Sequence, residues 1–349
     1  MNIAFYAGHC LPIHAYVLEE RPLGGTETGI VRLAAALQQR GHMVTVFTSH
    51  NEPPPSLPRY VSHRQALNFG SFDLVVVVQH LQALILRFPA ERVFFWTGDS
   101  FDQYSNFGLG DKRHADRVER FLSVSRWHAD TICEQSGFPR EKSFVLGNGL
   151  YLPYFIGEER RARKRLIFTP SPYRGLRLVP DAFRRIQQKH PDAEMHVFSG
   201  LAVYDRNEPF KGPERVEFER ISRQLKTISG VTVHGNVNQR QLARELMRSG
   251  IFFYPSTFLE TCCISAMEAQ AAGCPVITSA HSALPETVGD AGIFIPGEPG
   301  SVDYMDRLVS ETDRLLSDDS LWNELSQNGK RRAEAMSWDG VADRFEALL

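Results

Sequence analysis

Short apolar runs alternate with amphipathic stretches along nearly all of the 349 residues. The runs are rich in Val, Ile and Phe and show little in/out alternation, which is typical of strands buried on both faces of a parallel sheet. The amphipathic stretches between them predict the crossover helices that such a sheet needs. In the first part of the chain, we expect a helix at 27–40 and strands at 3–7, 43–48, 74–78, 93–96, 121–124 and 144–146.

The same pattern starts again after the charged segment 157–165. A helix is expected at 176–189, three more after Ser301, and strands at 166–169, 195–198, 231–234, 251–254, 276–278 and 293–295. We therefore predict an α/β protein with two Rossmann-like, doubly wound parallel-sheet domains, 1–160 and 161–335, facing an interdomain cleft. A last helix, 336–349, could pack back on the first domain.

The amino-acid composition excludes some classes of function. The hydrophobic fraction of 42% and the charged fraction of 23% are those of a globular protein, and the net charge of -2 gives nucleic-acid binding no support. Five cysteines without a C-x-x-C pair argue for reduced thiols and against a zinc site. With no signal peptide or membrane span visible, we expect a cytoplasmic protein. Peripheral contact with the inner face of the membrane stays open.

Two glutamates, Glu260 and Glu268, stand eight residues apart where a helix follows a buried strand. Fully helical residues between them would separate the carboxylates by about 12 Å along the axis. That span fits a nucleotide-sugar, with one carboxylate at the sugar hydroxyls and the other at the ribose. Free amides near Thr261, Cys262 and Cys263 could face its pyrophosphate. Spacing alone leaves the alternative of two ordinary helix glutamates.

The residues around this pair carry a specific resemblance. Pro-Ser precedes Glu260, Glu-Ala begins at Glu268, and Ala-Gly-Cys-Pro-Val-Ile follows. This order resembles the E-x7-E signature of family 4 retaining glycosyltransferases, which have the GT-B fold. The segments GGTETGIVRLAAALQQRGHMVTVFT, VSRWHAD, LGNGL and SPYRGL resemble the same family elsewhere along the chain. The chain departs from the family after Glu260, where Thr-Cys-Cys replaces a Gly-aromatic-Gly run.

The resemblance assigns roles to further residues. Arg174 takes the place of a basic residue that neutralises the donor pyrophosphate, although the family commonly has a lysine there as well. Gly24 and Gly25 match a glycine loop whose amides can approach a phosphate. A plain turn before a helix capped by Thr26 is the alternative reading.

The acceptor side is less defined by the resemblance. Related enzymes carry a histidine or an aspartate near the end of the strand at 93–96. We choose Asp99 there, with His80 and then His9 as rival acceptor-side candidates. We disfavour a nucleophilic role for Cys262 or Cys263, because no activating base is identifiable.

The function that the resemblance implies is that of a retaining, metal-independent hexosyltransferase without a cofactor. It would move a sugar from a nucleotide-diphosphate donor to an acceptor hydroxyl in surface-glycan or polysaccharide biosynthesis. Asp99, Glu260 and Arg174 are the expected catalytic residues. The acceptor could be a glycan, a lipid-linked glycan or a small molecule. A non-catalytic nucleotide-sugar-binding protein and a GT-B sugar-nucleotide epimerase are the alternatives.

Overall fold

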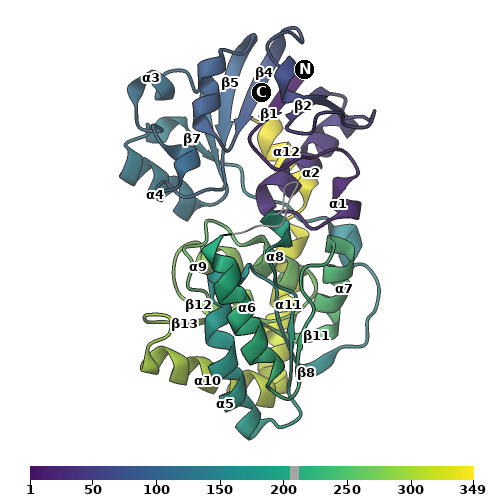
Figure 1. Ribbon diagram of the computed structural model, residues 1–349, viewed down its shortest axis with the longest axis vertical. Coiled ribbons are helices and arrows are strands. Elements are labelled where there is room, and N and C mark those ends of the chain that lie inside the picture. Colours follow the sequence, from purple (N-terminus) through teal and green to yellow (C-terminus); the bar gives the residue numbers. More distant parts are fainter. Residues whose placement is uncertain (205–211) are drawn as a thin grey trace. The chain divides into compact units, whose positions relative to one another are not determined.

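The computed structural model describes residues 1–204 and 212–349, which form two compact units (Figure 1). Unit 1 comprises Met1–Gly149 together with Trp338–Leu349, and unit 2 comprises Leu150–Ser337. Each unit is built on one parallel sheet, of seven strands in unit 1 and six in unit 2. The prediction of two doubly wound α/β domains is therefore confirmed.

The sheet of unit 1 has the strand order β3-β2-β1-β4-β5-β6-β7, and every pair is parallel. Its strands are β1 (Asn2–Ala7), β2 (Met43–Thr48), β3 (Arg59–Ser62), β4 (Phe72–Val78), β5 (Ala90–Trp96), β6 (Arg120–Ser123) and β7 (Ser143–Val145). The chain runs outward from β1 to β3 and then returns to the other side of β1 at β4. The sheet thus has a switch point between β1 and β4, the place where open α/β sheets bind ligands.

Helices cover both faces of this sheet. They are α1 (Val17–Glu20), α2 (Gly25–Gln39), α3 (Lys112–Ala115), α4 (Arg126–Ser136) and α12 (Trp338–Glu346), with 3₁₀ turns η1 (His63–Gln65), η2 (Leu81–Leu86), η3 (Tyr104–Asn106) and η4 (Arg140–Lys142). The C-terminal helix α12 packs on α2 in this unit (Figure 1). Phe345 of α12 lies 6.2 Å from the rings of both Phe5 and Phe94, ring centre to ring centre. The last residues of the chain therefore complete the core of the first unit.

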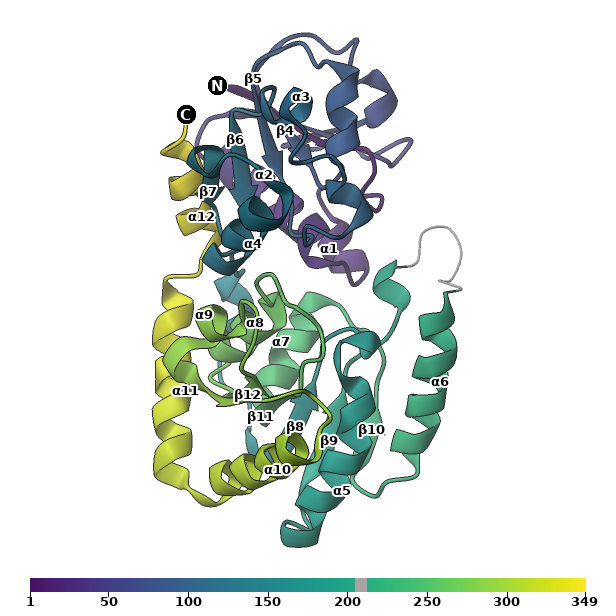
Figure 2. The same ribbon diagram turned by 90° about the vertical axis from the view of Figure 1, so that its left-hand side faces the viewer.

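Unit 2 has the strand order β10-β9-β8-β11-β12-β13, with its switch point between β8 and β11 (Figure 2). Its strands are β8 (Ala162–Phe168), β9 (Glu194–Val197), β10 (Val231–Val233), β11 (Ser249–Tyr254), β12 (Val276–Ser279) and β13 (Gly292–Ile295). Its α-helices are α5 (Val179–Lys189), α6 (Pro213–Lys226), α7 (Gln239–Arg248), α8 (Ile264–Ala271), α9 (Leu284–Val288), α10 (Val302–Ser317) and α11 (Asp319–Glu334). Its 3₁₀ turns are η5 (Leu152–Phe155), η6 (Pro172–Arg174), η7 (Leu176–Leu178), η8 (Ala202–Tyr204) and η9 (Gly289–Ala291). Since crossovers between parallel strands are right-handed, this strand order places α5 and α6 on one face of the sheet and α7, α8 and α9 on the other.

Three details differ from the sequence-based expectations. The strand β3 is not among the expected strands; it follows a proline-rich segment and is a short strand at the edge of its sheet. The helix expected from residue 176 begins as a 3₁₀ turn, and α5 starts only at Val179. The division between the units falls near residue 150 rather than 160, because the Leu150 amide donates to the Met336 carbonyl at 2.6 Å within unit 2.

The described residues contain no helix that combines the length and the apolar character needed to cross a bilayer.

Candidate functional site

The candidate site of unit 2 lies at the switch point of its sheet. Arg174 ends the 3₁₀ turn η6 after β8, and Glu260 lies in the loop after the neighbouring strand β11. These two loops contact each other directly, since the Thr257 amide donates to the Arg174 carbonyl at 3.1 Å. The fold therefore brings together two predicted site residues that are 86 positions apart in the chain.

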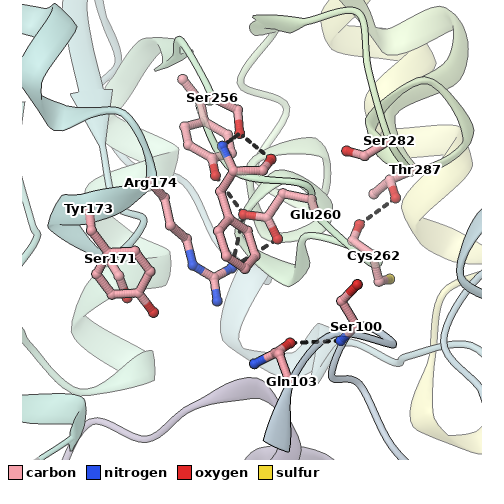
Figure 3. Close-up of polar contacts among 12 residues, drawn as sticks. Ser100, Gln103, Ser171, Tyr173, Arg174, Ser256, Glu260, Cys262, Ser282 and Thr287 are labelled. Carbon is pink, nitrogen blue, oxygen red and sulfur yellow. Dashed lines mark hydrogen bonds and ion pairs between the residues drawn. The ribbon is translucent and has the colours of Figure 1, made fainter. Parts of the chain in front are cut away.

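A salt bridge joins these two side chains. Arg174 Nη1 donates to both carboxylate oxygens of Glu260 at 2.9 Å, and the two groups point at each other in Figure 3. The Tyr254 hydroxyl, at the end of β11, donates to Glu260 Oε1 at 2.5 Å. Glu260 is only 3% exposed, so its carboxylate is held by charge-assisted hydrogen bonds away from solvent.

The surroundings of Arg174 keep it charged. Burial alone would lower its pKa, but the Glu260 carboxylate and nearby tyrosine hydroxyls raise the pKa of Arg174 well above its ordinary value. Its guanidinium carbon also lies 4.3 Å from the ring centre of Phe258, a cation–π contact. Within the described residues the buried Nε of Arg174 has no hydrogen-bond partner. The cation is therefore anchored through Nη1, and its Nη2 donates to no group among the described residues.

The close approach of the two loops depends on Gly175. This residue has φ +133°, and a Cβ added there would lie 2.2 Å from the Pro255 carbonyl oxygen. Any L side chain would meet both a disfavoured backbone conformation and a backbone atom.

We expect Gly175→Ala to destabilise the protein by about 2 kcal/mol or more, because it displaces the loop that carries Arg174. Gly297→Ala is a matched control, because Gly297 has φ +100° with no atom within 4 Å of an added Cβ. That variant should lose only about 1 kcal/mol, the cost of positive φ for an L residue. Urea unfolding of both variants measures the difference, and equal losses would contradict the proposed loop contact.

The expected helical spacing between Glu260 and Glu268 is wrong. The helix α8 begins only at Ile264, so Glu260 lies in the preceding loop and the separation of about 12 Å does not apply. The residue at the N-cap, Cys263, has φ +65°, a left-handed conformation that turns the chain into the helix. The first turn of α8 carries no side-chain cap and no acidic residue of its own.

Glu268 lies inside α8 and differs from Glu260 in its environment. Burial raises the pKa of Glu268 to about 7, although part of the residue stays accessible to water. No group in the described part of the chain donates a hydrogen bond to its carboxylate. An unpaired buried carboxylate is costly unless a ligand's hydroxyl groups complete its hydrogen bonding.

Of the residues that follow Glu260, the two cysteines pack in the interior and show no sign of a reactive thiol. Thr261 is partly exposed, whereas Cys262 and Cys263 are buried. Cys262 Sγ lies 3.7 Å from Met267 Sδ, and its carbonyl accepts a hydrogen bond from Thr287 (Figure 3). Burial raises the pKa of Cys263 well above its ordinary value, which opposes formation of a thiolate.

The candidate residues of unit 1 surround its own switch point. His9 follows β1, His80 follows β4, and Asp99 follows β5. The rings of His9 and His80 lie 4.8 Å apart, centre to centre. Asp99 Oδ2 accepts hydrogen bonds from Ser105 Oγ at 2.6 Å and from Gln79 Nε2 at 3.0 Å. The three candidate acceptor-side residues, His9, His80 and Asp99, thus follow neighbouring strands at the same edge of the sheet.

The glycine loop contains a residue that the sequence analysis missed. Gly24 is the N-cap of α2 and Gly25 its first residue, so the helix begins before Thr26. Glu27, 7% exposed, accepts a hydrogen bond from the Leu11 amide at 3.0 Å, and an added Cβ at Gly24 would lie 3.0 Å from its other oxygen. Burial raises the pKa of Glu27. A phosphate bound at the N-terminus of α2 would therefore lie close to the carboxyl group of Glu27.

In the described residues, no cluster of three or more His, Cys, Asp and Glu side chains has the arrangement of a metal site.

Two doubly wound sheets, each with its candidate residues at the switch point, define the class, which is the GT-B fold. The structure matches sucrose-phosphate synthase from Thermosynechococcus elongatus with a TM-score of 0.71 at 16% identity, over 100% of this chain and 98% of that one. It matches Anabaena HepE in complex with UDP and glucose with a TM-score of 0.71 at 14% identity, over 100% and 99% of the chains. At such identities these likenesses show the fold alone.

The sequence itself is similar to a known family and to known proteins. Residues 169–332 match the model for glycosyl transferases group 1. It is 27% identical over 285 residues to the MMP alpha-(1->4)-mannosyltransferase of Mycolicibacterium hassiacum, covering 79% of this chain and 65% of that protein. It is also 27% identical over 254 residues to the D-inositol 3-phosphate glycosyltransferase of Streptomyces bingchenggensis, covering 67% and 53%. The chain thus spans less than two thirds of the length of these curated relatives.

Proposed function

We propose that the protein is a retaining hexosyltransferase that moves a sugar from a nucleotide-diphosphate donor to an acceptor hydroxyl without a metal ion or other cofactor. The observation that carries the proposal is the Arg174–Glu260–Tyr254 network at the switch point of unit 2, with the unpaired carboxylate of Glu268 on the helix that follows. The family match over residues 169–332 covers this entire site.

In this proposal unit 2 binds the donor. Arg174 supplies the cation that stabilises the charge developing on the diphosphate leaving group, through donors not engaged by Glu260. The uncapped first turn of α8 adds backbone amides for the same charge. Glu260 and the adjacent residues Thr261, Cys262 and Cys263 hold the transferred sugar, and Glu268 accepts hydrogen bonds from the ribose hydroxyls.

Unit 1 binds the acceptor. Asp99 orients the attacking hydroxyl. Gly24 and Gly25 of the same unit contribute to donor binding instead, because their backbone amides can approach the donor diphosphate. The named relatives include a mannosyltransferase and an inositol-phosphate glycosyltransferase, which favour a hexose donor and a polar acceptor. We place the reaction in the cytoplasm, in glycan biosynthesis, with peripheral contact at the inner membrane face left as part of the proposal.

The test is donor binding followed by product analysis. A thermal-shift panel of UDP-, GDP- and ADP-sugars, with EDTA and with magnesium, should show stabilisation by at least one donor that EDTA does not diminish. Product formed from that donor should keep the anomeric configuration of the donor sugar, as read from its anomeric proton by NMR. Stabilisation without turnover on any acceptor would favour a non-catalytic binding protein instead. Conversion of the donor without an acceptor would favour an epimerase.

A further inference from the structure

The turn that ends β4 has a strained geometry that organises one edge of unit 1. Gln79 has φ +68°, and the His80 amide donates to the Val78 carbonyl at 2.8 Å, which forms a γ-turn of the rare positive-φ kind. The Gln79 amide donates to the Trp96 carbonyl of the neighbouring strand at 2.7 Å, which fixes the turn to the sheet. A non-glycine residue held in such a conformation is typical of functional sites.

The side chains of the consecutive residues Gln79 and His80 contact different neighbours. The Gln79 amide group donates to Asp99 Oδ2 at 3.0 Å and accepts a hydrogen bond from Cys10 Sγ at 3.4 Å. Ser105 Oγ donates to the same Asp99 oxygen at 2.6 Å. None of the residues that the structure describes donates to the other oxygen, Oδ1. The carboxylate is therefore oriented by two donors, with one oxygen left for a ligand.

The ring of His80 belongs to a continuous row of rings. Ring centres are 6.3 Å apart from Tyr6 to His9, 4.8 Å from His9 to His80, 6.3 Å from His80 to Tyr104, and 5.7 Å from Tyr104 to Phe107. The row runs from the buried Tyr6 to the exposed Tyr104 and Phe107, which are 69% and 58% exposed. The two outer rings are adjacent and open to solvent, so this end of the row is not part of a core and can contact a ligand.

The row of rings and the Asp99 carboxylate are held in place by neighbouring residues of the same two segments. Gln79, which holds Asp99, immediately precedes His80 in the row, and Ser105, which also holds Asp99, immediately follows Tyr104. The Gln82 side chain fixes the outer rings by donating to the carbonyls of Tyr104 and Phe107 at 3.1 and 3.3 Å. The aromatic faces and the available Asp99 oxygen therefore keep a fixed relation to each other.

We infer that this aromatic row is an acceptor subsite for a pyranose ring, so that the acceptor is a saccharide rather than a simple polyol or an alkyl alcohol. This inference rests on the proposed function and names its acceptor class. A pyranose presents an apolar C–H face beside a rim of hydroxyls. The negative faces of aromatic rings attract the C–H face, and a carboxylate accepts hydrogen bonds from the hydroxyl rim. An alkyl chain would use the rings but leave the Asp99 oxygen unpaired.

The test uses methyl α-D-mannopyranoside and methyl α-D-glucopyranoside as probes, with 1-butanol and glycerol as non-saccharide comparisons. Saturation-transfer NMR on the wild-type protein should show transfer to the ring protons of at least one pyranoside and to neither comparison compound. Tyr104→Leu should weaken that binding by about fivefold while Tyr104→Phe retains it, because only the latter keeps an aromatic face. Tyr16→Leu, at a tyrosine of the same unit that is 53% exposed and outside the row, should have no effect.

The donor assay separates this inference from the proposed function. All three variants should keep the stabilisation that the sugar nucleotide gives to wild-type protein, since neither Tyr104 nor Tyr16 is among the residues assigned to the donor. Pyranoside binding that is absent in wild type, or unchanged in Tyr104→Leu, overturns the acceptor subsite even where the donor stabilises the protein. Failure of every sugar nucleotide to stabilise wild type overturns the proposed function instead, whatever the pyranosides show.

Discussion

Replacing Glu260 with Gln is expected to lower kcat/KM for sugar transfer by about a thousandfold while the protein stays folded. The carboxylate is buried and is held by Arg174 and Tyr254, so its position is fixed before the donor arrives. An amide of the same shape keeps part of this hydrogen bonding but cannot accept from every donor around it. It also removes the negative charge that holds Arg174 in place.

The Glu260→Gln variant should still fold, because the positive charge left on Arg174 is not buried without access to water. Arg174 keeps 28% of its side-chain surface accessible and stacks on Phe258, so its cation can be solvated after Glu260 is neutralised. Glu298→Gln is the matched control, because Glu298 is an exposed glutamate of the same unit. Initial rates with the donor identified by thermal shift measure the effect. Activity of the Glu260→Gln variant within tenfold of wild type would sink the assignment of Glu260 to the sugar site.

The sequence pattern predicts most of the fold because strands buried on both faces need continuous apolar runs. The pattern fails where the local sequence favours one conformation and contacts with distant parts of the chain impose another. The strand β3 follows a proline-rich segment, and its pairing with β2 is not visible in the composition of that segment. The start of α8 was placed too early, because nothing in the sequence shows that Cys263 adopts positive φ.

The same limit applies to the candidate sites. Glu260 and Arg174 could be chosen from the motifs, but their salt bridge depends on the close approach of two loops at Gly175. Tyr254 belongs to an apolar run, Ile-Phe-Phe-Tyr, and its hydroxyl could be taken for an incidental polar atom. Gln79 carries no signal at all, since its role comes from a γ-turn that many sequences could form. Spacing identifies candidate residues, whereas contacts between loops decide what those residues can do.

Replacing Glu268 with Gln is expected to stabilise the protein above neutral pH while weakening donor binding. The pKa of Glu268 is raised by burial from 4.5 to about 7, so the folded state binds the proton more tightly than the unfolded chain does. Its contribution to stability is therefore fully present below about 4.5 and is lost as pH rises through about 7. Glutamine does not ionise, so the variant should be more stable than wild type by about 2 kcal/mol near pH 8 and equal to it near pH 4.5, allowing for the part of the residue that water reaches.

Donor binding should respond in the opposite direction. Ribose hydroxyls donate to a carboxylate better than to an amide, so the variant should bind the sugar nucleotide about tenfold to a hundredfold more weakly. For the same reason the donor should stabilise wild type more as pH rises through about 7, and this trend should be absent in the variant. Urea unfolding and donor-induced thermal shifts across this pH range test both halves. A variant whose stability follows wild type at every pH would contradict the raised pKa, and one that binds the donor normally would remove Glu268 from the site. The two results together would show whether an unpaired carboxylate, destabilising in the free protein, is retained because the donor completes its hydrogen bonds.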